Sequence, residues 1–232
     1  MNAEDKALIE LRNVTAMQKG KATAENIQLK LNNGSVYGIC ASEEQLTLLT
    51  DLFAGALTPV DGTVLINGFD MTKEAKRAKE FIGFMPSQSF LPSCMTPLEY
   101  LLFVADIKGL EYRKTVRRIS DVLDFTYLSS KRNTLIKQLS VYEQRCLSLS
   151  QAIIGRGEIL ILNMPYKGLT LSEADRLTAL LEEAFEERTV ILGDTDAQSL
   201  RSLCDTVYAF DGQAFSLMEE KGSDPTNRKE ER

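Results

Sequence analysis

The chain has 232 residues, of which 44% are hydrophobic and 26% are charged. This length allows one large domain or two small ones, and the composition is that of a globular protein and not of a disordered chain. The formal net charge of −6 gives no general attraction to phosphate backbones, so we expect no nucleic-acid partner. Histidine is absent from the sequence, which excludes histidine-ligated metals and any imidazole general base.

The cysteines and the N-terminal residues indicate the compartment. Cys40, Cys94, Cys146 and Cys204 are widely spaced and form no CxxC pair, so we interpret them as buried, reduced thiols and expect no metal site. The N-terminal residues lack a basic stretch followed by an apolar one, and no apolar run reaches the roughly 18 residues that span a bilayer. These features predict a cytoplasmic chain that is not itself an integral membrane protein.

Short strands and turns fill the first part of the chain. The patterns predict strands over residues 7–14, 27–31, 36–40, 64–66 and 81–85, and helices over residues 45–54 and 72–80. Gly55 is expected to cap the first of these helices. From about residue 87 to 140 the sequence has helical character, with amphipathic candidates over residues 96–108 and 112–123. We interpret this stretch as a helical subdomain.

Helices and strands alternate in the remainder. Helices are expected over residues 140–154, 172–187 and 197–203, and strands over residues 159–162, 189–192 and 206–210. Such alternation predicts crossover connections and a buried, mainly parallel sheet. Thr170 and Glu173 have the spacing of a capping box where the second of these helices begins. Residues 219–232 are mostly charged, and we expect a disordered tail after a domain of residues 1–218.

Several strings, taken in order, resemble the ATPase subunit of ATP-binding cassette (ABC) transporters over residues 8 to 216. They are DGTVLING at 61–68, IGFMP at 82–86, MTPLEYL at 95–101, LS at 139–140, ILIL at 159–162 and LCDTV at 203–207. The resemblance implies an α/β fold: a P-loop NTPase-like cassette with a mainly parallel sheet, an N-terminal antiparallel β subdomain and a helical subdomain. In that family the cofactors are ATP and Mg²⁺, and the partners are a membrane permease and a second cassette.

The stretch that corresponds to the family's phosphate-binding loop departs from its pattern. Such a loop needs glycines, a lysine for the β- and γ-phosphates and a hydroxyl for Mg²⁺. The corresponding positions here are Gly38, Ser42, Glu43, Glu44, Gln45, Leu46 and Thr47. Only the entrance glycine remains, and the lysine is lost at Gln45–Leu46. Glu43 or Glu44 beside a phosphate charge would cost about 4 kcal/mol at an effective dielectric of about 20, whereas the helix dipole contributes about 0.3 to 1 kcal/mol. We therefore expect these glutamates to cap their own helix.

At the other positions implied by the family, the residues needed for nucleotide chemistry are also replaced. Asn163 stands at the Walker B aspartate, Met164 at the glutamate that polarises water, and Thr195 at the switch histidine. Both signature glycines are replaced, so Ser140 is the one signature residue left to reach a phosphate. Ser87 falls at the Q-loop glutamine, and a one-residue slip would place Gln88 there instead. Gln18 or a neighbouring residue stands where an aromatic ring would stack on adenine. We expect no catalytic residues and no cofactor; ATP and Mg²⁺ would bind only if the family's binding function survives.

In the family, a groove beside the Q-loop receives a short helix of the membrane permease. Phe90, Leu91 and Met95 are the candidate contacts here. The leading hypothesis is a degenerate subunit, unable to hydrolyse ATP, that acts as a structural or regulatory partner. It would pair with an active cassette ATPase, a copy of itself or a permease, on the inner face of the cell membrane. Two alternatives stay open: a subunit that binds ATP while its partner hydrolyses it, and a freestanding pseudo-ATPase interaction protein.

Overall fold

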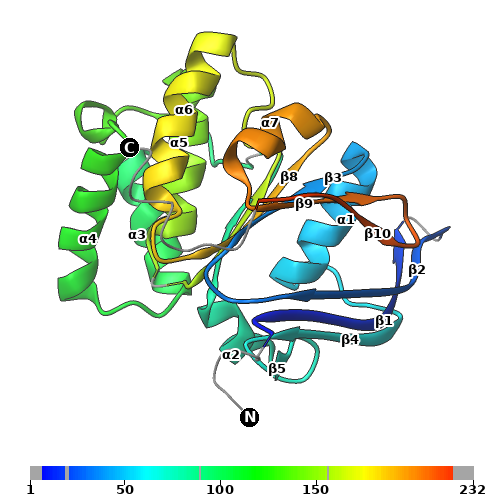
Figure 1. Cartoon of the computed structure of the whole chain (residues 1–232). Coiled ribbons are helices and arrows are strands. Elements are labelled where there is room, and N and C mark those ends of the chain that lie inside the picture. The colour runs from blue at the N-terminus through cyan, green and yellow to red at the C-terminus, as the bar shows by residue number, and fades with distance from the viewer. Residues whose placement is uncertain (1–6, 19–20, 89, 156, 222–232) are drawn as a thin grey trace.

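The computed structural model describes residues 7–18, 21–88, 90–155 and 157–221 (Figure 1). The strands are β1 (Ile9–Gln18), β2 (Lys21–Leu31), β3 (Val36–Cys40), β4 (Asp61–Ile66), β5 (Phe69–Asp70), β6 (Ile82–Met85), β7 (Ile159–Asn163), β8 (Thr189–Asp194), β9 (Thr206–Phe210) and β10 (Phe215–Glu220). The α-helices are α1 (Glu43–Ala54), α2 (Ala75–Glu80), α3 (Pro97–Ile107), α4 (Tyr112–Phe125), α5 (Val141–Ile153), α6 (Leu171–Ala184) and α7 (Ala197–Leu203). Two short 3₁₀ turns, η2 (Ser129–Lys131) and η3 (Ile136–Gln138), connect α4 to α5.

Two sheets organise these elements. The larger has the order β10-β9-β3-β8-β7-β6, and its strands pair in parallel except for β10, which is antiparallel to β9. The smaller sheet has the order β2-β1-β4-β5 and is antiparallel. Figure 1 shows α1 between the two sheets and α3 to α6 gathered on the other side of the larger sheet. Both the mainly parallel sheet and the N-terminal antiparallel sheet that the sequence predicts are present.

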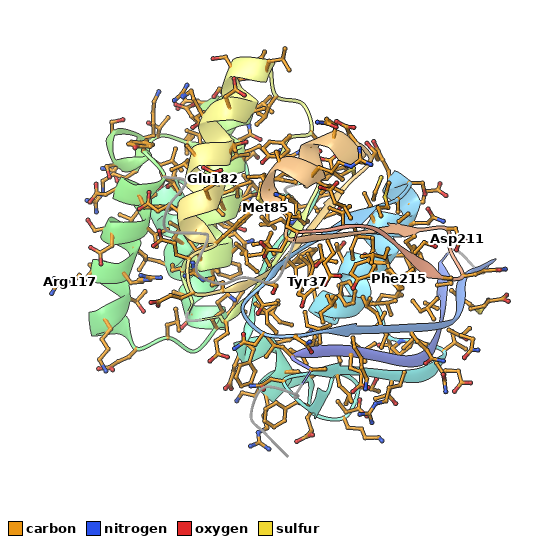
Figure 2. All side chains as sticks on the ribbon, in the orientation of Figure 1. Tyr37, Met85, Arg117, Glu182, Asp211 and Phe215 are labelled. Carbon is orange, nitrogen blue, oxygen red and sulfur yellow. The ribbon has the colours of Figure 1, made fainter. Side chains whose placement is uncertain are left out.

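The larger sheet is buried on both faces, and the middle of each of its central strands β7 and β8 is a continuous apolar run. Ile159, Ile161 and Ile191 pack with α1 and the smaller sheet, whereas Leu160 and Leu192 pack with the helices on the opposite face. Successive side chains of a strand point to opposite faces, so one continuous apolar run serves both layers. Figure 2 shows Met85 among the side chains between sheet and helices, and Arg117 at the outer surface.

Helix ends follow the predicted caps. Gly55 ends α1 with φ of 64°, in the left-handed region that glycine adopts without strain. The capping box of Thr170 and Glu173 opens α6. Helix α6 ends at Ala184, three residues earlier than the sequence indicates, and α2 begins at Ala75 and not at residue 72.

Two strands were not expected from the sequence. Strand β5 has only two residues, which is too short to show an apolar pattern. Strand β10 lies at the edge of its sheet and most of its residues are exposed, so its sequence shows no clear apolar pattern either. Strand β10 includes Glu219 and Glu220, the first two residues of the expected tail. Residues 222–232 of that tail lie outside the described residues.

Two findings concern the membrane and the cysteines. In the part of the chain that the structure describes, no helix combines the length and apolar character needed to cross a bilayer. All four cysteines are free thiols, but the expectation that all are buried is wrong. Cys146 and Cys204 are buried, Cys40 is half-buried, and Cys94 is exposed in the loop before α3.

Gly83→Ala should destabilise the fold, because β6 approaches α5 closely at this glycine. A Cβ at Gly83 would lie 2.2 Å from the backbone carbonyl oxygen of Ala152, so strand and helix would have to separate. We expect a loss of about 1–3 kcal/mol in urea unfolding. Gly155→Ala is the matched control, since its Cβ would meet nothing closer than 3.8 Å. Equal stability of the two variants would contradict the packing argument.

Candidate functional site

The C-terminal ends of β3, β8 and β7 meet at one edge of the larger sheet. Cys40 pairs in register with Asp194, and Asn163 with Gly193. This edge therefore collects the start of α1, the residues after β7 and the residues after β8. Of the positions implied by the resemblance, the α1 positions, Asn163, Met164 and Thr195 come together here.

The connection between β3 and α1 consists of two residues, Ala41 and Ser42. The Ser42 hydroxyl accepts the backbone N–H of Gln45 at 3.4 Å, and the Gln45 side-chain oxygen accepts the Ser42 N–H at 3.0 Å. This capping box occupies donors that a phosphate would need. Glu43 and Glu44 lie in the first turn as expected, but the expectation that they cap the helix is wrong: Ser42 and Gln45 do so.

Leu46 turns into the core and not toward solvent. Its side chain is 1% exposed, and a Cβ at Gly193 would lie 3.0 Å from Leu46 Cδ2. Gly193 thus leaves room for Leu46 against β8. Gly38 has a packing role as well, because its Cβ would lie 3.0 Å from Cys204 Sγ. The resemblance places Gly38 and Leu46 where the family contacts nucleotide. In this structure both residues pack against apolar or thiol side chains instead.

A buried polar pair links α1 to β7. The Asn163 side-chain N–H donates to Thr50 Oγ1 at 3.1 Å, and the Thr50 hydroxyl donates to the Leu46 carbonyl at 2.8 Å. Asn163 Oδ1 is buried and has no hydrogen-bond partner among the residues that the structure describes. The next residue, Met164, is 4% exposed and has φ of 45°, and its N–H donates to the Gly193 carbonyl at 2.8 Å. Neither a neutral amide nor a thioether supplies the carboxylate oxygens that Mg²⁺ prefers.

An ion pair connects the start of α1 with the segment after β7. Lys167 Nζ lies 2.5 Å from Glu43 Oε2, and the Lys167 carbonyl accepts Arg145 Nη2 at 2.8 Å. Thr47, the retained hydroxyl position, donates to the Glu43 carbonyl at 2.8 Å. Lys167 was not among the predicted site residues, although it is a cation placed just after the strand that ends at Asn163.

The segment after β8 carries a desolvated carboxylate. Burial raises the pKa of Asp194, although its carboxylate accepts the Asp196 N–H at 3.1 Å. Burial and then the charge of Asp194 raise the pKa of the neighbouring Cys40 thiol, which donates to the Thr195 carbonyl at 3.6 Å. Thr195 itself is exposed. The Asp194 carboxylate, when ionised, adds negative charge to an edge that already carries Glu43, which disfavours a polyphosphate, whereas the raised pKa of Cys40 keeps its thiol neutral.

The remaining predicted nucleotide positions lie on other elements. Ser140 caps α5: its hydroxyl accepts the Glu143 N–H at 3.2 Å, and the Glu143 carboxylate accepts the Ser140 N–H at 2.8 Å. Gln88 is exposed after β6. Gln18 ends β1, and its side chain lies outside the described residues.

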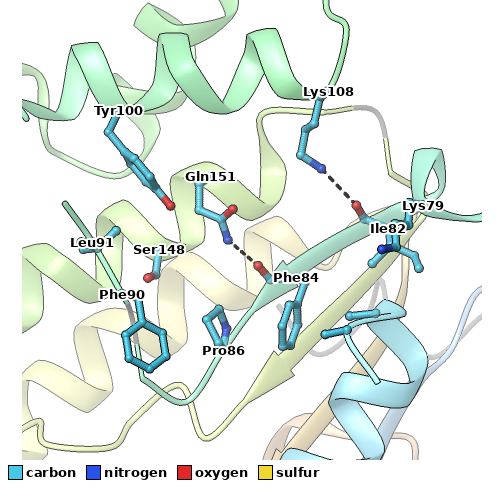
Figure 3. Close-up of a pocket in the computed structure, with 12 residues that line it drawn as sticks. Lys79, Ile82, Phe84, Pro86, Phe90, Leu91, Tyr100, Lys108, Ser148 and Gln151 are labelled. Atoms are coloured by element: carbon cyan, nitrogen blue, oxygen red, sulfur yellow. Dashed lines mark hydrogen bonds between the residues drawn. The ribbon is translucent and has the colours of Figure 1, made fainter. Parts of the chain in front are cut away.

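The residues predicted to contact a partner lie in the loop between β6 and α3. Phe90 is 88% exposed, whereas Leu91 and Met95 are half-buried against the helical core. The Met95 carbonyl accepts the Ile136 N–H at 2.9 Å, which fixes this loop to the segment before α5. Phe90 and Leu91 also line a cavity of about 350 Å³ between α3, α5 and β6 (Figure 3).

Comparison with known proteins gives one family. The sequence model described as ABC transporter matches residues 24–167. The Nod factor export ATP-binding protein I of Sinorhizobium fredii (strain NBRC 101917 / NGR234) is 27% identical over 92% of this chain, and the human phospholipid-transporting ATPase ABCA3 is 26% identical over 75%. The matches span 65% of the first relative and 10% of the second.

Solved structures show the same fold. The ATP-binding cassette MJ0796, in a dimeric post-hydrolysis state with ADP and Pi, superposes with a TM-score of 0.81 at 20% identity, covering 92% of this chain and 99% of that chain. An ATP-binding subunit of an ABC transporter superposes with a TM-score of 0.78 at 16% identity, covering 91% of this chain and 90% of that one. The cassette fold expected from the sequence is therefore confirmed.

Thr50→Val should destabilise the protein by about 1–3 kcal/mol, because it leaves the Asn163 N–H buried without an acceptor. Thr50→Val with Asn163→Leu should recover most of this loss, since both polar partners are then replaced. Urea unfolding measures both effects. Thr47→Val is the control, because its hydroxyl bonds only to its own helix near the surface. A Thr50→Val loss no greater than that of the control would disprove the role of the buried pair.

Asp194→Asn should stabilise the protein at neutral pH and not at acid pH. The folded-state pKa of Asp194 is raised, so the folded state binds its proton more tightly than the unfolded state does. Stability is then lost as pH rises from near the ordinary carboxyl pKa of about 3.9 through the raised value. Thermal unfolding should show the variant and the wild type converging near pH 3 and separating by pH 7. A difference that is independent of pH would contradict this expectation.

Proposed function

The chain belongs to the ABC transporter family, and from this premise we propose that it does not hydrolyse ATP and serves as a structural or regulatory partner. The observation that carries the proposal is the closure of the start of α1. Ser42 caps the helix over a two-residue connection, and Leu46 fills the space beside Gly193. Phosphoryl transfer depends on positioning and on electrostatic stabilisation, and these residues supply neither.

The electrostatics of the edge support the same proposal. Lys167, the cation that contacts the start of α1, is paired with Glu43, and Asp194 adds a further carboxylate. No cluster of metal-ligating side chains is found in the described part of the chain. A bound Mg-ATP would have to break the Ser42 cap and bring its charge beside Glu43. The residues present therefore do not fit this cofactor.

The partner side of the proposal rests on exposed apolar surface. Phe90 is 88% exposed, and Phe103 and Ile107 on α3 are 50% and 69% exposed. Apolar side chains spaced along one face of a helix beside a cavity suit the helix-in-groove mode of recognition. We assign this surface to a helix of a membrane permease subunit, which places the chain in the cytoplasm, on the inner face of the membrane. An active cassette ATPase or a second copy of this chain would be the other partner.

Isothermal titration and a phosphate-release assay test the loss of nucleotide chemistry. The purified chain should show no Mg-ATP dissociation constant below about 100 μM, equivalent to about −5.5 kcal/mol, and no phosphate release. Glu43→Gln with Glu44→Gln is the matched variant, and it should behave in the same way because the cap and Leu46 still close the site. Tight binding by the wild type would overturn the proposal. Tight binding by the variant alone would show that charge, and not the closed loop, excludes the nucleotide.

Co-purification tests the partner side. Phe90→Asp should abolish co-purification with a co-expressed membrane permease subunit, because it places a charge on the exposed apolar surface. Val60→Asp is the control: it is also exposed, at 63%, but lies before β4, away from the cavity. Retention of the membrane subunit by the Phe90 variant would exclude this docking surface. A wild-type chain that purifies alone would favour a freestanding interaction protein.

A further inference from the structure

The free edge of β6 is covered by side chains and not by another strand. Strand β6 ends the larger sheet and pairs there with β7 alone. The Phe81 carbonyl accepts the Ile159 N–H at 2.9 Å, so it faces β7. Carbonyls alternate in direction along a strand, so those of Ile82, Phe84 and Pro86 face away from β7. Such a row of acceptors on an edge strand is open to solvent or to another chain unless something covers it.

Three long side chains donate to these three carbonyls, one at every second residue. They are Lys108 Nζ on Ile82 at 3.3 Å, the Gln151 side-chain N–H on Phe84, and Arg145 Nη1 on Pro86 at 3.4 Å. Figure 3 shows the first two of these bonds. Lys108 is the C-cap of α3, whereas Arg145 and Gln151 belong to α5. We call these three side chains the β6 clamp.

The helices that carry the clamp are also tied to one another. Apolar residues of α3, α4 and α5 belong to one buried cluster, and we call these three helices the helical layer. Arg118 on α4 donates to the carbonyls of Ile153 and Ile154 at 3.0 and 3.4 Å, which joins α4 to the end of α5. The polar bonds of Arg118 therefore lie inside the helical layer, whereas those of the clamp join the layer to the sheet.

A change in the orientation of the layer would separate the clamp from its acceptors. Arg145 is 7% exposed, and burial lowers the pKa of both Arg145 and Lys108. Donors that have been removed from water are costly to leave without an acceptor. The backbones also meet closely here, because a Cβ at Gly83 would lie 2.2 Å from the Ala152 carbonyl oxygen. Strand and helix thus fit together in one seating.

We propose that the β6 clamp locks the helical layer in a single orientation against the sheet, without any nucleotide or partner. The cavity of about 350 Å³ between α3, α5 and β6 is then held open in advance by the clamp. This inference goes beyond the proposed function, because it concerns the layer itself and is independent of what the chain binds.

Double electron–electron resonance between two spin labels tests the orientation in the full chain. Arg117→Cys on α4 and Gln213→Cys between β9 and β10 are exposed positions that report on the layer and on the larger sheet. Cys40→Ser and Cys94→Ser remove the two thiols that are not buried. This labelled chain should give one narrow distance distribution.

Lys108→Met and Gln151→Leu each remove one donor of the clamp. Either change should widen the distance distribution about twofold or add a second maximum, because a second orientation becomes populated. Arg118→Gln is the matched control: it removes bonds from a cation to backbone carbonyls inside the layer, and the distribution should stay narrow.

Two maxima in the chain with an intact clamp would overturn the inference, as would clamp variants whose distributions are as narrow as that of the intact clamp. Equal widening by Arg118→Gln would show a general loosening of the helices and would overturn it as well. Circular dichroism of each variant checks that the fold is retained. If Gln151→Leu unfolds, Gln151→Met provides the same test.

Discussion

The two-residue connection between β3 and α1 is the constraint on which the candidate site depends. A longer, glycine-rich connection would let successive N–H groups converge on an anion. Here the chain enters the helix at Glu43, and the donors of the first turn meet Ser42 and Gln45. The helix is thereby seated so that Leu46, three residues into it, faces β8 where Gly193 has no side chain. Cap and packing are two consequences of one short loop.

The position of α1 against β8 also explains the buried pair between Thr50 and Asn163. Thr50 follows Leu46 by one helical turn, so it lies on the same face of α1 and meets the end of β7. Asparagine at this position donates to the threonine hydroxyl, which a carboxylate would be unable to do. Within the described residues the pair leaves Asn163 Oδ1 without a partner, and a buried acceptor of this kind costs about 1–3 kcal/mol.

Local features could be predicted from the sequence, whereas long-range pairs could not. The caps at Gly55 and Thr170 depend on a few adjacent residues, and the convergence of the strand ends follows from a parallel sheet. The pair of Glu43 with Lys167 joins residues 124 apart in the chain, and no local pattern marks it. Strand β10 was missed for a different reason: an exposed edge strand is specified by its neighbour β9 and not by its own hydrophobicity.

Arg145 joins the groove to the closed edge without any nucleotide. Its guanidinium is buried and donates to the Pro86 carbonyl at 3.4 Å and to the Lys167 carbonyl at 2.8 Å. Pro86 lines the cavity, and Lys167 holds Glu43, so one cation bonds to segments of both regions. Because the links are backbone carbonyls, a helix docked against Pro86 would act on the segment after β7 through the position of the main chain. In the nucleotide-free function proposed above, this route would operate without ATP.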